Sequence, residues 1–207
     1  MKRIGVLGGS FDPVHYGHLL LAETCREACR LDQVLFVPAA VAPHKQSGSN
    51  AADSDRIEML RLAIGGHEPF DVCTIEVDRG GVSYTVDTLR ELQARDADAE
   101  LFFLLGADSL GDLPTWREPA QICEIATLAV VARAGSPPPD LEALKALLPG
   151  AGGRPVRAQL VSMPLFQLSS TEIRERASQG LSIRFRTPRA VETYIEAHRI
   201  YRHAAAR

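Results

Sequence analysis

The sequence predicts an α/β protein with a doubly wound, mainly parallel sheet of five to six strands and helices on both faces. Apolar runs of strand length alternate with segments of helical periodicity, each about 10–15 residues long, and this spacing is typical of βαβ units. The composition is ordinary for a globular protein, with 45% hydrophobic and 24% charged residues. A chain of 207 residues is also long enough to bury one sizeable core. We therefore expect residues 1–207 to form a single domain.

The expected strands are short apolar runs bounded by glycine, proline or charged residues. The run at 100–105 is continuously apolar, which indicates a strand covered on both faces. The run at 72–77 alternates instead, which indicates a strand with one exposed face. In chain order, the expected strands are 3–7, 33–37, 72–77, 100–105, 127–132 and 160–163.

Helices are expected where apolar residues recur at helical spacing or where a capping residue precedes them. Asp53 or Ser54 would cap the second helix, and Ser83 would cap the third. Pro188 suits the start of the last helix, because the N–H that proline lacks is unpaired there in any case. The expected helices span 17–29, 56–64, from Ser83 to about 95, 170–177 and from 187–188 to about 198. This pattern amounts to a Rossmann-like architecture whose C-terminal helices carry the SSTEIR motif at 169–174.

Two segments interrupt the alternation of strands and helices. Residues 47–53 are small and polar, which indicates a mobile loop. Residues 134–155 contain three consecutive prolines and a Gly-Ala-Gly-Gly sequence around a short helical run at 141–147. We expect a surface insertion there rather than a domain boundary.

Charge and hydropathy exclude several classes of protein. The 23 basic and 26 acidic residues give a net charge of −3, which argues against binding long nucleic acid through bulk charge. The longest purely apolar stretch, 101–105, is far shorter than the roughly 18 residues of a membrane span. The four cysteines form no C-x-x-C pair, so we expect reduced, mostly buried thiols. The sequence therefore predicts a cytoplasmic protein with neither nucleic acid nor a membrane as partner.

The first motif, GGSFDPVHYGH at 8–18, joins the first strand to the first helix. Ligands of parallel sheets bind at the carboxyl ends of the strands, where helix N-termini favour phosphate. Gly8 and Gly9 would let the backbone approach an anion, and His15 and His18 would donate to phosphate oxygens from one side of the helix start. The alternative is a tight turn with two surface histidines. The motif is not a Walker loop, and a metal pair would lack a third ligand of matching spacing.

The second motif, SSTEIR at 169–174, precedes a helix. Ser169 and Glu172 have the spacing of a capping box, which is the structural alternative. A capping box needs only one hydroxyl, however, whereas this motif offers three hydroxyls and an arginine, Arg174, one turn further along. It therefore predicts a second anion site at a helix N-terminus. Two such sites on one edge of a sheet would suit a polyphosphate.

Together the two motifs resemble those of the H-x-G-H nucleotidyltransferase superfamily, and the other motifs are similar to its nicotinate-nucleotide adenylyltransferase branch. The likeness extends over nearly the whole chain. Ser10 stands where the family often has threonine, and Leu168 where it has isoleucine, so both keep the chemical character. In the family's order, the matching segments are 8–19, 43–45, 83–89, 102–110, 114–116 and 169–174.

This resemblance implies the transfer of AMP from ATP to nicotinate mononucleotide, which gives the deamido dinucleotide and pyrophosphate in NAD biosynthesis. The mononucleotide phosphate would attack the α-phosphorus of ATP directly, so catalysis would consist of positioning and charge stabilisation. Mg²⁺ would be carried by the ATP phosphates and not by protein ligands. The partners would be the two small-molecule substrates, and the oligomeric state, including a homo-oligomer, stays open. The alternatives are another member of the superfamily, such as a pantetheine-phosphate adenylyltransferase or a cytidylyltransferase, and a nucleotide-binding regulator without activity.

The resemblance also implies roles for individual residues. The catalytic residues would be His15, His18, Lys45 and Arg174. The ATP site would comprise Gly8, Gly9, Ser10, Phe11, His15, His18, Gly106, Asp108, Ser169, Ser170, Thr171 and Arg174. The nicotinate mononucleotide site would comprise His44, Lys45, Ser83, Tyr84, Thr85, Trp116 and Arg133.

In this second site, Trp116 would stack on the pyridine ring, and the backbone amides of Tyr84 and Thr85 would receive the carboxylate. Three residues have ordinary structural alternatives. Trp116 would equally suit the core, Asp108 the cap of the helix after the fourth strand, and Lys45 a solvated surface.

Overall fold

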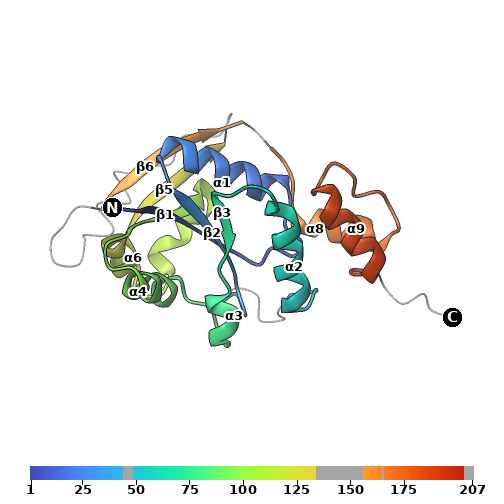
Figure 1. The fold of residues 1–207 in the computed structure, drawn as a ribbon, viewed down its shortest axis with the longest axis horizontal. Coiled ribbons are helices and arrows are strands. Elements are labelled where there is room, and N and C mark those ends of the chain that lie inside the picture. Colours follow the sequence, from blue (N-terminus) through green and yellow to red (C-terminus); the bar gives the residue numbers. More distant parts are fainter. Residues whose placement is uncertain (44–48, 134–155, 165, 203–207) are drawn as a thin grey trace.

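The computed structural model describes residues 1–43, 49–133, 156–164 and 166–202. Within this part of the chain, six strands form one sheet in the order β3-β2-β1-β4-β5-β6 (Figure 1), and every neighbouring pair is parallel. The predicted parallel, doubly wound sheet is therefore confirmed. The insertion predicted at 134–155 lies outside the described residues. The strands are β1 (Arg3–Gly9), β2 (Gln33–Pro38), β3 (Phe70–Val72), β4 (Glu100–Gly106), β5 (Ala126–Arg133) and β6 (Ala158–Met163).

The five predicted helices are all present, and shorter helices accompany them. The predicted ones are α1 (Tyr16–Ala28), α2 (Asp53–Ile64), α4 (Thr85–Arg95), α8 (Ser170–Ser178) and α9 (Arg189–His198). The others are α3 (Ile75–Arg79), α5 (Ala107–Asp112), the 3₁₀ turn η1 (Leu113–Thr115) and α6 (Pro119–Ile125). Three of these four lie between β4 and β5, where the sequence predicted no helix with a stated range and indicated one only through the alternative role of Asp108, the cap of a helix after the fourth strand.

The strand predicted at 72–77 was wrong beyond its first residue, because β3 ends at Val72 and α3 begins at Ile75. Thr74 closes the turn that starts α3. Its Oγ1 donates to Asp78 Oδ2 at 2.7 Å, and its carbonyl accepts from the Asp78 N–H at 2.8 Å. Such local bonds compete with a strand ladder. The alternation of apolar residues reflects a single helical turn that buries Ile75 against the sheet.

The predicted caps were also wrong. Neither Asp53 nor Ser54 caps α2, which begins directly behind Ala52 without a side-chain cap. Ser83 does not cap α4 either. Its Oγ instead accepts a hydrogen bond from the Ala40 N–H at 3.0 Å, which ties the start of α4 to the segment that follows β2.

The sheet has a hydrophobic core on each face, and β4 shows the alternation. Phe102 and Leu104 pack with residues of α1, α2, α8 and α9, whereas Leu101, Phe103 and Leu105 pack with residues of α3, α4 and α6. The chain winds from β1 outward to β3 and then returns to β4 beside β1. Open α/β sheets bind their ligands at such a reversal of strand order, outside the carboxyl ends of the strands.

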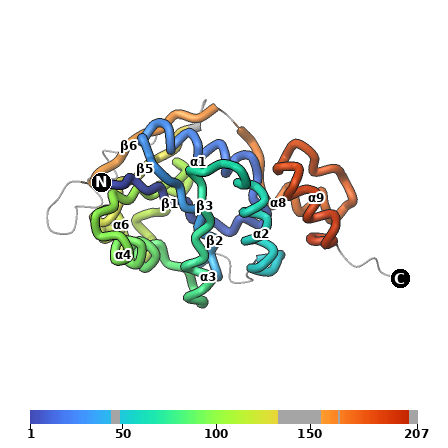
Figure 2. Tube along the Cα trace, in the orientation of Figure 1, coloured from blue at the N-terminus to red at the C-terminus, as the bar shows by residue number. Residues whose placement is uncertain are grey.

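The last two helices lie at one end of the sheet, beside α2 (Figures 1 and 2). α9 packs on α2, and the Tyr194 hydroxyl of α9 donates to Asp55 Oδ1 of α2 at 2.9 Å. The chain reaches these helices from β6, the edge strand farthest from β3. This return brings the start of α8 to the connection between β1 and α1.

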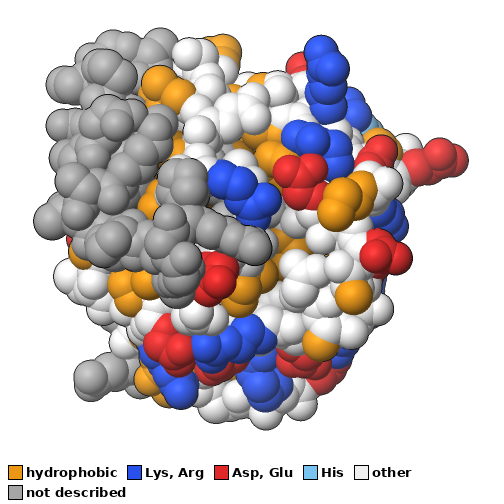
Figure 3. Space-filling model, turned by 90° about the vertical axis from the view of Figure 1, so that its left-hand side faces the viewer, with side chains coloured by type: hydrophobic (Ala, Val, Ile, Leu, Met, Phe, Trp, Pro, Cys, Tyr) orange, Lys and Arg blue, Asp and Glu red, His pale blue; other side chains and the backbone are white. Residues whose placement is uncertain are grey.

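The surface mixes both signs of charge with apolar side chains. On the face shown in Figure 3, Lys and Arg side chains of the described residues lie close to Asp and Glu side chains. No helix within the described ranges is both long and apolar enough to cross a membrane.

Candidate active site

The carboxyl ends of β1 and β4 leave room for a ligand. A methyl group added at Gly8 or at Gly106 would meet no atom within 4 Å. Gly9 has a different role, because a methyl group there would touch the ring of Phe11 at 3.1–3.3 Å. The Phe11 side chain is 1% exposed and packs in the core, so this residue has only backbone atoms to offer a ligand. Gly8 and Gly106 therefore mark the open ends of two adjacent strands.

His15 and His18 stack on each other where α1 begins. Their ring centroids lie 3.7 Å apart with an interplanar angle of 20°. A methyl group at Gly17 would lie 3.0 Å from the His15 ring, which explains the glycine between the two histidines. The His15 N–H donates to His18 Nδ1 at 3.3 Å, so a neutral His18 ring carries its proton on Nε2. The predicted projection of both rings from one side of the helix start is confirmed.

The two imidazoles differ in burial. His15 is 6% exposed, and burial lowers its pKa from 6.5 to about 4. This ring is therefore neutral at pH 7, and its Nδ1 is buried without a hydrogen-bond partner among the described residues. The alternative of two surface histidines is wrong for His15, which is a fixed neutral ring that supports His18.

The β1–α1 loop, residues 10–15, is held by side chains from the C-terminal part of the chain. Arg174 Nη1 donates to the Asp12 carbonyl at 2.7 Å. Ser170 Oγ donates to the Pro13 carbonyl at 2.8 Å, and Thr187 Oγ1 donates to the Val14 carbonyl at 2.8 Å. These bonds place the start of α8 directly against the loop that leads to His15. The convergence of the two motifs that the sequence predicted is therefore present.

Of the three hydroxyl groups of the second motif, two bond to the protein backbone and the third lines a pocket. Ser169 caps α8, because its Oγ accepts from the Glu172 N–H at 3.1 Å, as the capping alternative predicted. Ser170 is committed to the β1–α1 loop. Thr171 Oγ1 accepts from Arg174 Nη2 at 3.2 Å, and both side chains line a pocket of about 400 Å³. Thr171 and Arg174 are therefore the members of the motif whose side chains face an open pocket.

Asp12 is a buried carboxylate that the sequence analysis did not single out. It is 2% exposed, and it accepts hydrogen bonds from Asn50 N–H (2.7 Å), Asn50 Nδ2 (3.2 Å), Ala51 N–H (3.1 Å) and Tyr201 Oη (2.7 Å). Burial by itself would raise the pKa of this carboxyl, but the hydrogen bonds outweigh it and the pKa lies below the usual 3.8. The mobile loop predicted at 47–53 was wrong for its last residues, because Asn50 and Ala51 bind Asp12 and Asp53 already belongs to α2.

Arg56 is a second buried charged residue that the sequence did not predict as part of the site. Its side chain is fully buried and donates to the carbonyls of Ser10 and Ala39 and to Asp53 Oδ1, each at 2.6 Å. It thereby links the segments that follow β1 and β2. The position of Asp12, an acidic residue within a turn rich in Gly and Pro, could have indicated its role. No local pattern indicates that Arg56 binds the carbonyls of Ser10 and Ala39, or that Tyr201 binds Asp12, because these partners are distant in sequence.

A second pocket, of about 160 Å³, lies at the start of α4. Four residues predicted to bind nicotinate mononucleotide line it together: Ser83, Tyr84, Thr85 and Trp116. Trp116 also packs edge-on against Phe103 at 5.9 Å between ring centroids. The core packing that was the alternative for this tryptophan is therefore present, and the same side chain also lines the pocket.

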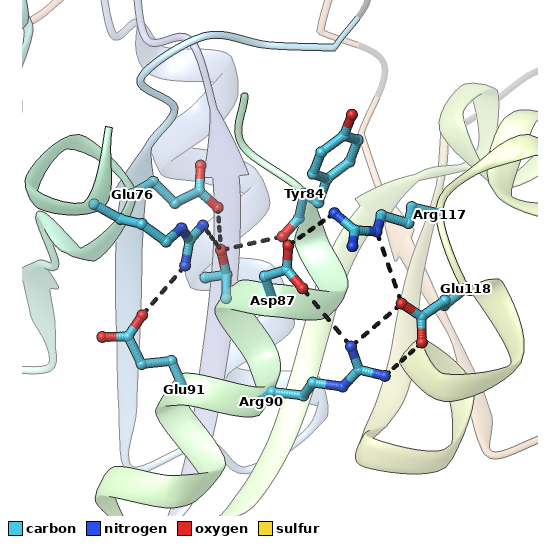
Figure 4. A network of polar contacts seen from close by, with 9 residues as sticks. Glu76, Tyr84, Asp87, Arg90, Glu91, Arg117 and Glu118 are labelled. Atoms are coloured by element: carbon cyan, nitrogen blue, oxygen red, sulfur yellow. Dashed lines mark hydrogen bonds and ion pairs between the residues drawn. The ribbon is translucent and has the colours of Figure 1, made fainter. Parts of the chain in front are cut away.

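A network of polar contacts (Figure 4) reaches the second pocket at Tyr84 and Arg117, which both line it. Arg117 lies over the ring of Tyr84, with its guanidinium carbon 4.7 Å from the ring centroid. The same guanidinium pairs with Asp87 at 3.4 Å and with Glu118 at 3.7 Å, and Arg90 pairs with the same two carboxylates. The network therefore joins the first turn of α4 to the segment that carries Trp116.

The remaining predicted residues lie at the edges of the site or outside the described residues. Gly106 is the N-cap of α5, so the capping alternative for Asp108 is wrong, and Asp108 lies exposed in the first turn. Arg133 ends β5 and pairs with Met163 in the ladder. His44 and Lys45 lie outside the described residues, directly after Pro43, which lines the second pocket.

Comparison with known proteins gives a consistent result. The family model described as cytidylyltransferase-like matches residues 6–176. A probable nicotinate-nucleotide adenylyltransferase of Thermus thermophilus is 47% identical over 204 residues, covering 97% of this chain and 100% of the relative. One from Thermomicrobium roseum is 44% identical over 202 residues, covering 98% and 92%. The solved nicotinic acid mononucleotide adenylyltransferase of Plasmodium falciparum, complexed with NaAD, has the same fold at 18% identity, with a TM-score of 0.79 and coverage of 97% and 98%.

The burial of His15 predicts a specific pH dependence of stability. Between pH 6.5 and about 4 the unfolded chain binds a proton at His15 and the folded protein does not, so the free energy of unfolding falls as the pH drops through this window. We expect His15→Asn to remove that part of the slope, about 1 kcal/mol per pH unit. Urea unfolding at pH 7, 6 and 5 measures it, with His198→Asn at an exposed site as control. Parallel pH curves for His15→Asn and the parent would contradict the assignment.

Proposed function

Because the chain belongs to the nicotinate-nucleotide adenylyltransferase family, we propose that it transfers the AMP group of ATP to nicotinate mononucleotide and releases nicotinate adenine dinucleotide and pyrophosphate. The observation that carries the proposal is the contact between the β1–α1 loop, which leads to the stacked histidines, and the start of α8. Donors from two helix N-termini can thereby meet a single triphosphate. The aromatic pocket at the start of α4 supplies a separate place for the second substrate.

In this proposal, ATP lies across the open ends of β1 and β4. His18 donates its Nε2 proton to the phosphate that is transferred, while Thr171, Arg174 and the first N–H groups of α8 hold the outer phosphates. The bond from Arg174 to the Asp12 carbonyl fixes the guanidinium before ATP binds. Lys45 and Asp108 keep the roles that the resemblance implies, toward phosphate and ribose respectively.

Nicotinate mononucleotide occupies the pocket lined by Tyr84, Thr85 and Trp116. Thr85 is the first residue of α4, and the first N–H groups of a helix have no partner within it, so they suit the carboxylate of the pyridine ring. Trp116 offers a flat face to the same ring, which is cationic in the mononucleotide. His44 and Arg133 remain proposed contacts to this substrate.

The reaction needs no nucleophile from the protein, because the substrate phosphate attacks phosphorus itself. The cysteines fit this view, since all four are free thiols and burial raises the pKa of Cys25 to about 12 and of Cys123 to about 11. The residues around the site would act by holding two anions in line, a contribution of about 7–11 kcal/mol in model reactions.

Magnesium fits this site as a companion of ATP. Within the described ranges, no group of three His, Cys, Asp or Glu side chains could hold a metal ion. Asp12, the acidic side chain of the β1–α1 loop, is occupied by donors from Asn50, Ala51 and Tyr201. We therefore propose that Mg²⁺ binds to the phosphate oxygens of ATP, where it would neutralise negative charge.

A turnover assay tests the proposed reaction. With ATP and Mg²⁺, the purified chain should release pyrophosphate fastest with nicotinate mononucleotide, more slowly with its amide, and not with phosphopantetheine. Faster turnover of phosphopantetheine would contradict the proposal, and no turnover of any substrate would favour a nucleotide-binding regulator.

His18→Ala removes the donor assigned to the transferred phosphate. We expect kcat to fall about 10²–10³-fold, the loss usually seen when one donor to a developing negative charge is removed. The exposed His198→Ala is the matched control and should keep the parent kcat. If His18→Ala releases pyrophosphate at the parent rate, the assigned role is wrong.

Trp116→Ala removes the ring that would stack on the pyridine. We expect the KM of nicotinate mononucleotide to rise about 5–150-fold, since stacking on an aromatic side chain contributes about 1–3 kcal/mol per base elsewhere. The KM of ATP should stay within about two-fold, and Trp116→Phe should keep much of the affinity because it keeps a ring. Equal increases in both KM values would mean that Trp116 acts only through the core.

A further inference from the structure

We propose that Tyr201 is a positioning residue of the active site, which acts through the buried Asp12 on the β1–α1 loop and so on His18. This inference rests on the proposed function, because it assigns Tyr201 a part in placing the groups that bind ATP. Tyr201 follows α9 near the end of the described chain and lies 189 residues from Asp12, yet its hydroxyl donates to Asp12 Oδ1 at 2.7 Å.

The environment of Asp12 and Tyr201 stabilises the hydrogen bond between them. Asp12 is 2% exposed, and a buried carboxylate is tolerated only where hydrogen-bond donors surround it. Tyr201 supplies the donor that comes from the C-terminal segment, while Asn50 and Ala51 supply those before α2. Burial strongly raises the pKa of Tyr201, and the Asp12 charge raises it further, so the phenol keeps its proton and remains a donor.

The hydrogen bond between Tyr201 and Asp12 can influence the position of the histidines because residues 12 to 15 are consecutive in the chain. The carbonyls of Asp12, Pro13 and Val14 are each held by a side chain from α8 or from the segment before α9. His15 comes next, and its N–H is the donor that orients the His18 ring. A displacement of Asp12 would therefore shift the acceptor of Arg174 and the donor to His18 together.

Two other charged groups, Arg174 and Arg56, lie near Asp12 and Tyr201 and make their hydrogen bonds to the loop independently of Tyr201. Arg174 of α8 donates to the Asp12 carbonyl, and Arg56 of α2 donates to the carbonyl of Ser10. Both lie close enough to lower the pKa of Tyr201 slightly against the larger effects of burial and Asp12. With these cations retained, the loss of the Tyr201 hydroxyl changes the placement of Asp12 without removing its charge compensation.

The test is Tyr201→Phe, which keeps the ring and removes only the hydroxyl. We expect kcat at saturating substrates to fall about 10–100-fold, since small misplacements of catalytic groups have effects of this size. The KM of nicotinate mononucleotide, whose pocket is remote from Tyr201, should change less than two-fold. With one donor fewer, the pKa of Asp12 rises toward its usual value, so the acid limb of the kcat profile should move to higher pH.

Tyr194→Phe is the matched control, because Tyr194 also donates to an aspartate, Asp55, and also joins the C-terminal part to the rest of the molecule. It should keep the parent kcat and pH profile. If Tyr201→Phe behaves like Tyr194→Phe, the positioning role is wrong.

Asp12→Asn provides a second variant that tests the same contact if Tyr201→Phe folds poorly. It should lower kcat similarly, and a parent-like kcat would overturn the inference. A parent protein that makes no dinucleotide contradicts the proposed function, whereas an active parent with an unaffected Tyr201→Phe contradicts only the role of Tyr201.

Discussion

The active site depends on three hydrogen bonds to consecutive carbonyls of the β1–α1 loop. Their donors, Ser170, Arg174 and Thr187, lie 157 to 173 residues further along the chain. A loop of this kind has no ladder to satisfy its backbone, so its carbonyls need partners from elsewhere. Because two of these donors, Ser170 and Arg174, belong to the motif at 169–174, the bonds that order the loop also bring the two motifs together. The same hydrogen bonds therefore order the loop and assemble the site.

Two buried charges complete this arrangement, and both lie where unrelated segments meet. Arg56 joins the segments after β1 and β2, and Asp12 joins the loop to the residue pair before α2 and to Tyr201. Burying a charge is unfavourable unless hydrogen bonds compensate it, so these loops must place their polar groups where Arg56 and Asp12 can bind them. This requirement gives the loops a precision that apolar packing alone would not impose.

The sheet and its long helices could be predicted from the sequence because they follow from hydrophobic periodicity, which is local. The short elements between β4 and β5 could not, since each spans only three to seven residues, too few for a periodic pattern. The same distinction applies to the site. His15, His18 and Arg174 belong to local motifs and could be predicted as candidates, whereas Arg56 and Tyr201 bind loop residues that are distant in sequence. Ser169 and Ser170 were predicted as phosphate ligands, but in the structure their hydroxyls cap α8 and bind the loop.

In the proposed binding mode, the charges near the second pocket explain how an anionic ring substituent can be accepted beside an acidic helix start. Asp87 lies in the first turn of α4, where it competes with any carboxylate for the positive end of the helix. Arg117 and Arg90 both pair with Asp87, so its charge is compensated within the protein (Figure 4). Because Arg117 also covers the Tyr84 ring, the same side chain shapes the pocket wall. In the proposed binding mode, the first N–H groups of α4 then bind the substrate carboxylate, and a preference for the acid over the amide would follow from the compensated charge of Asp87.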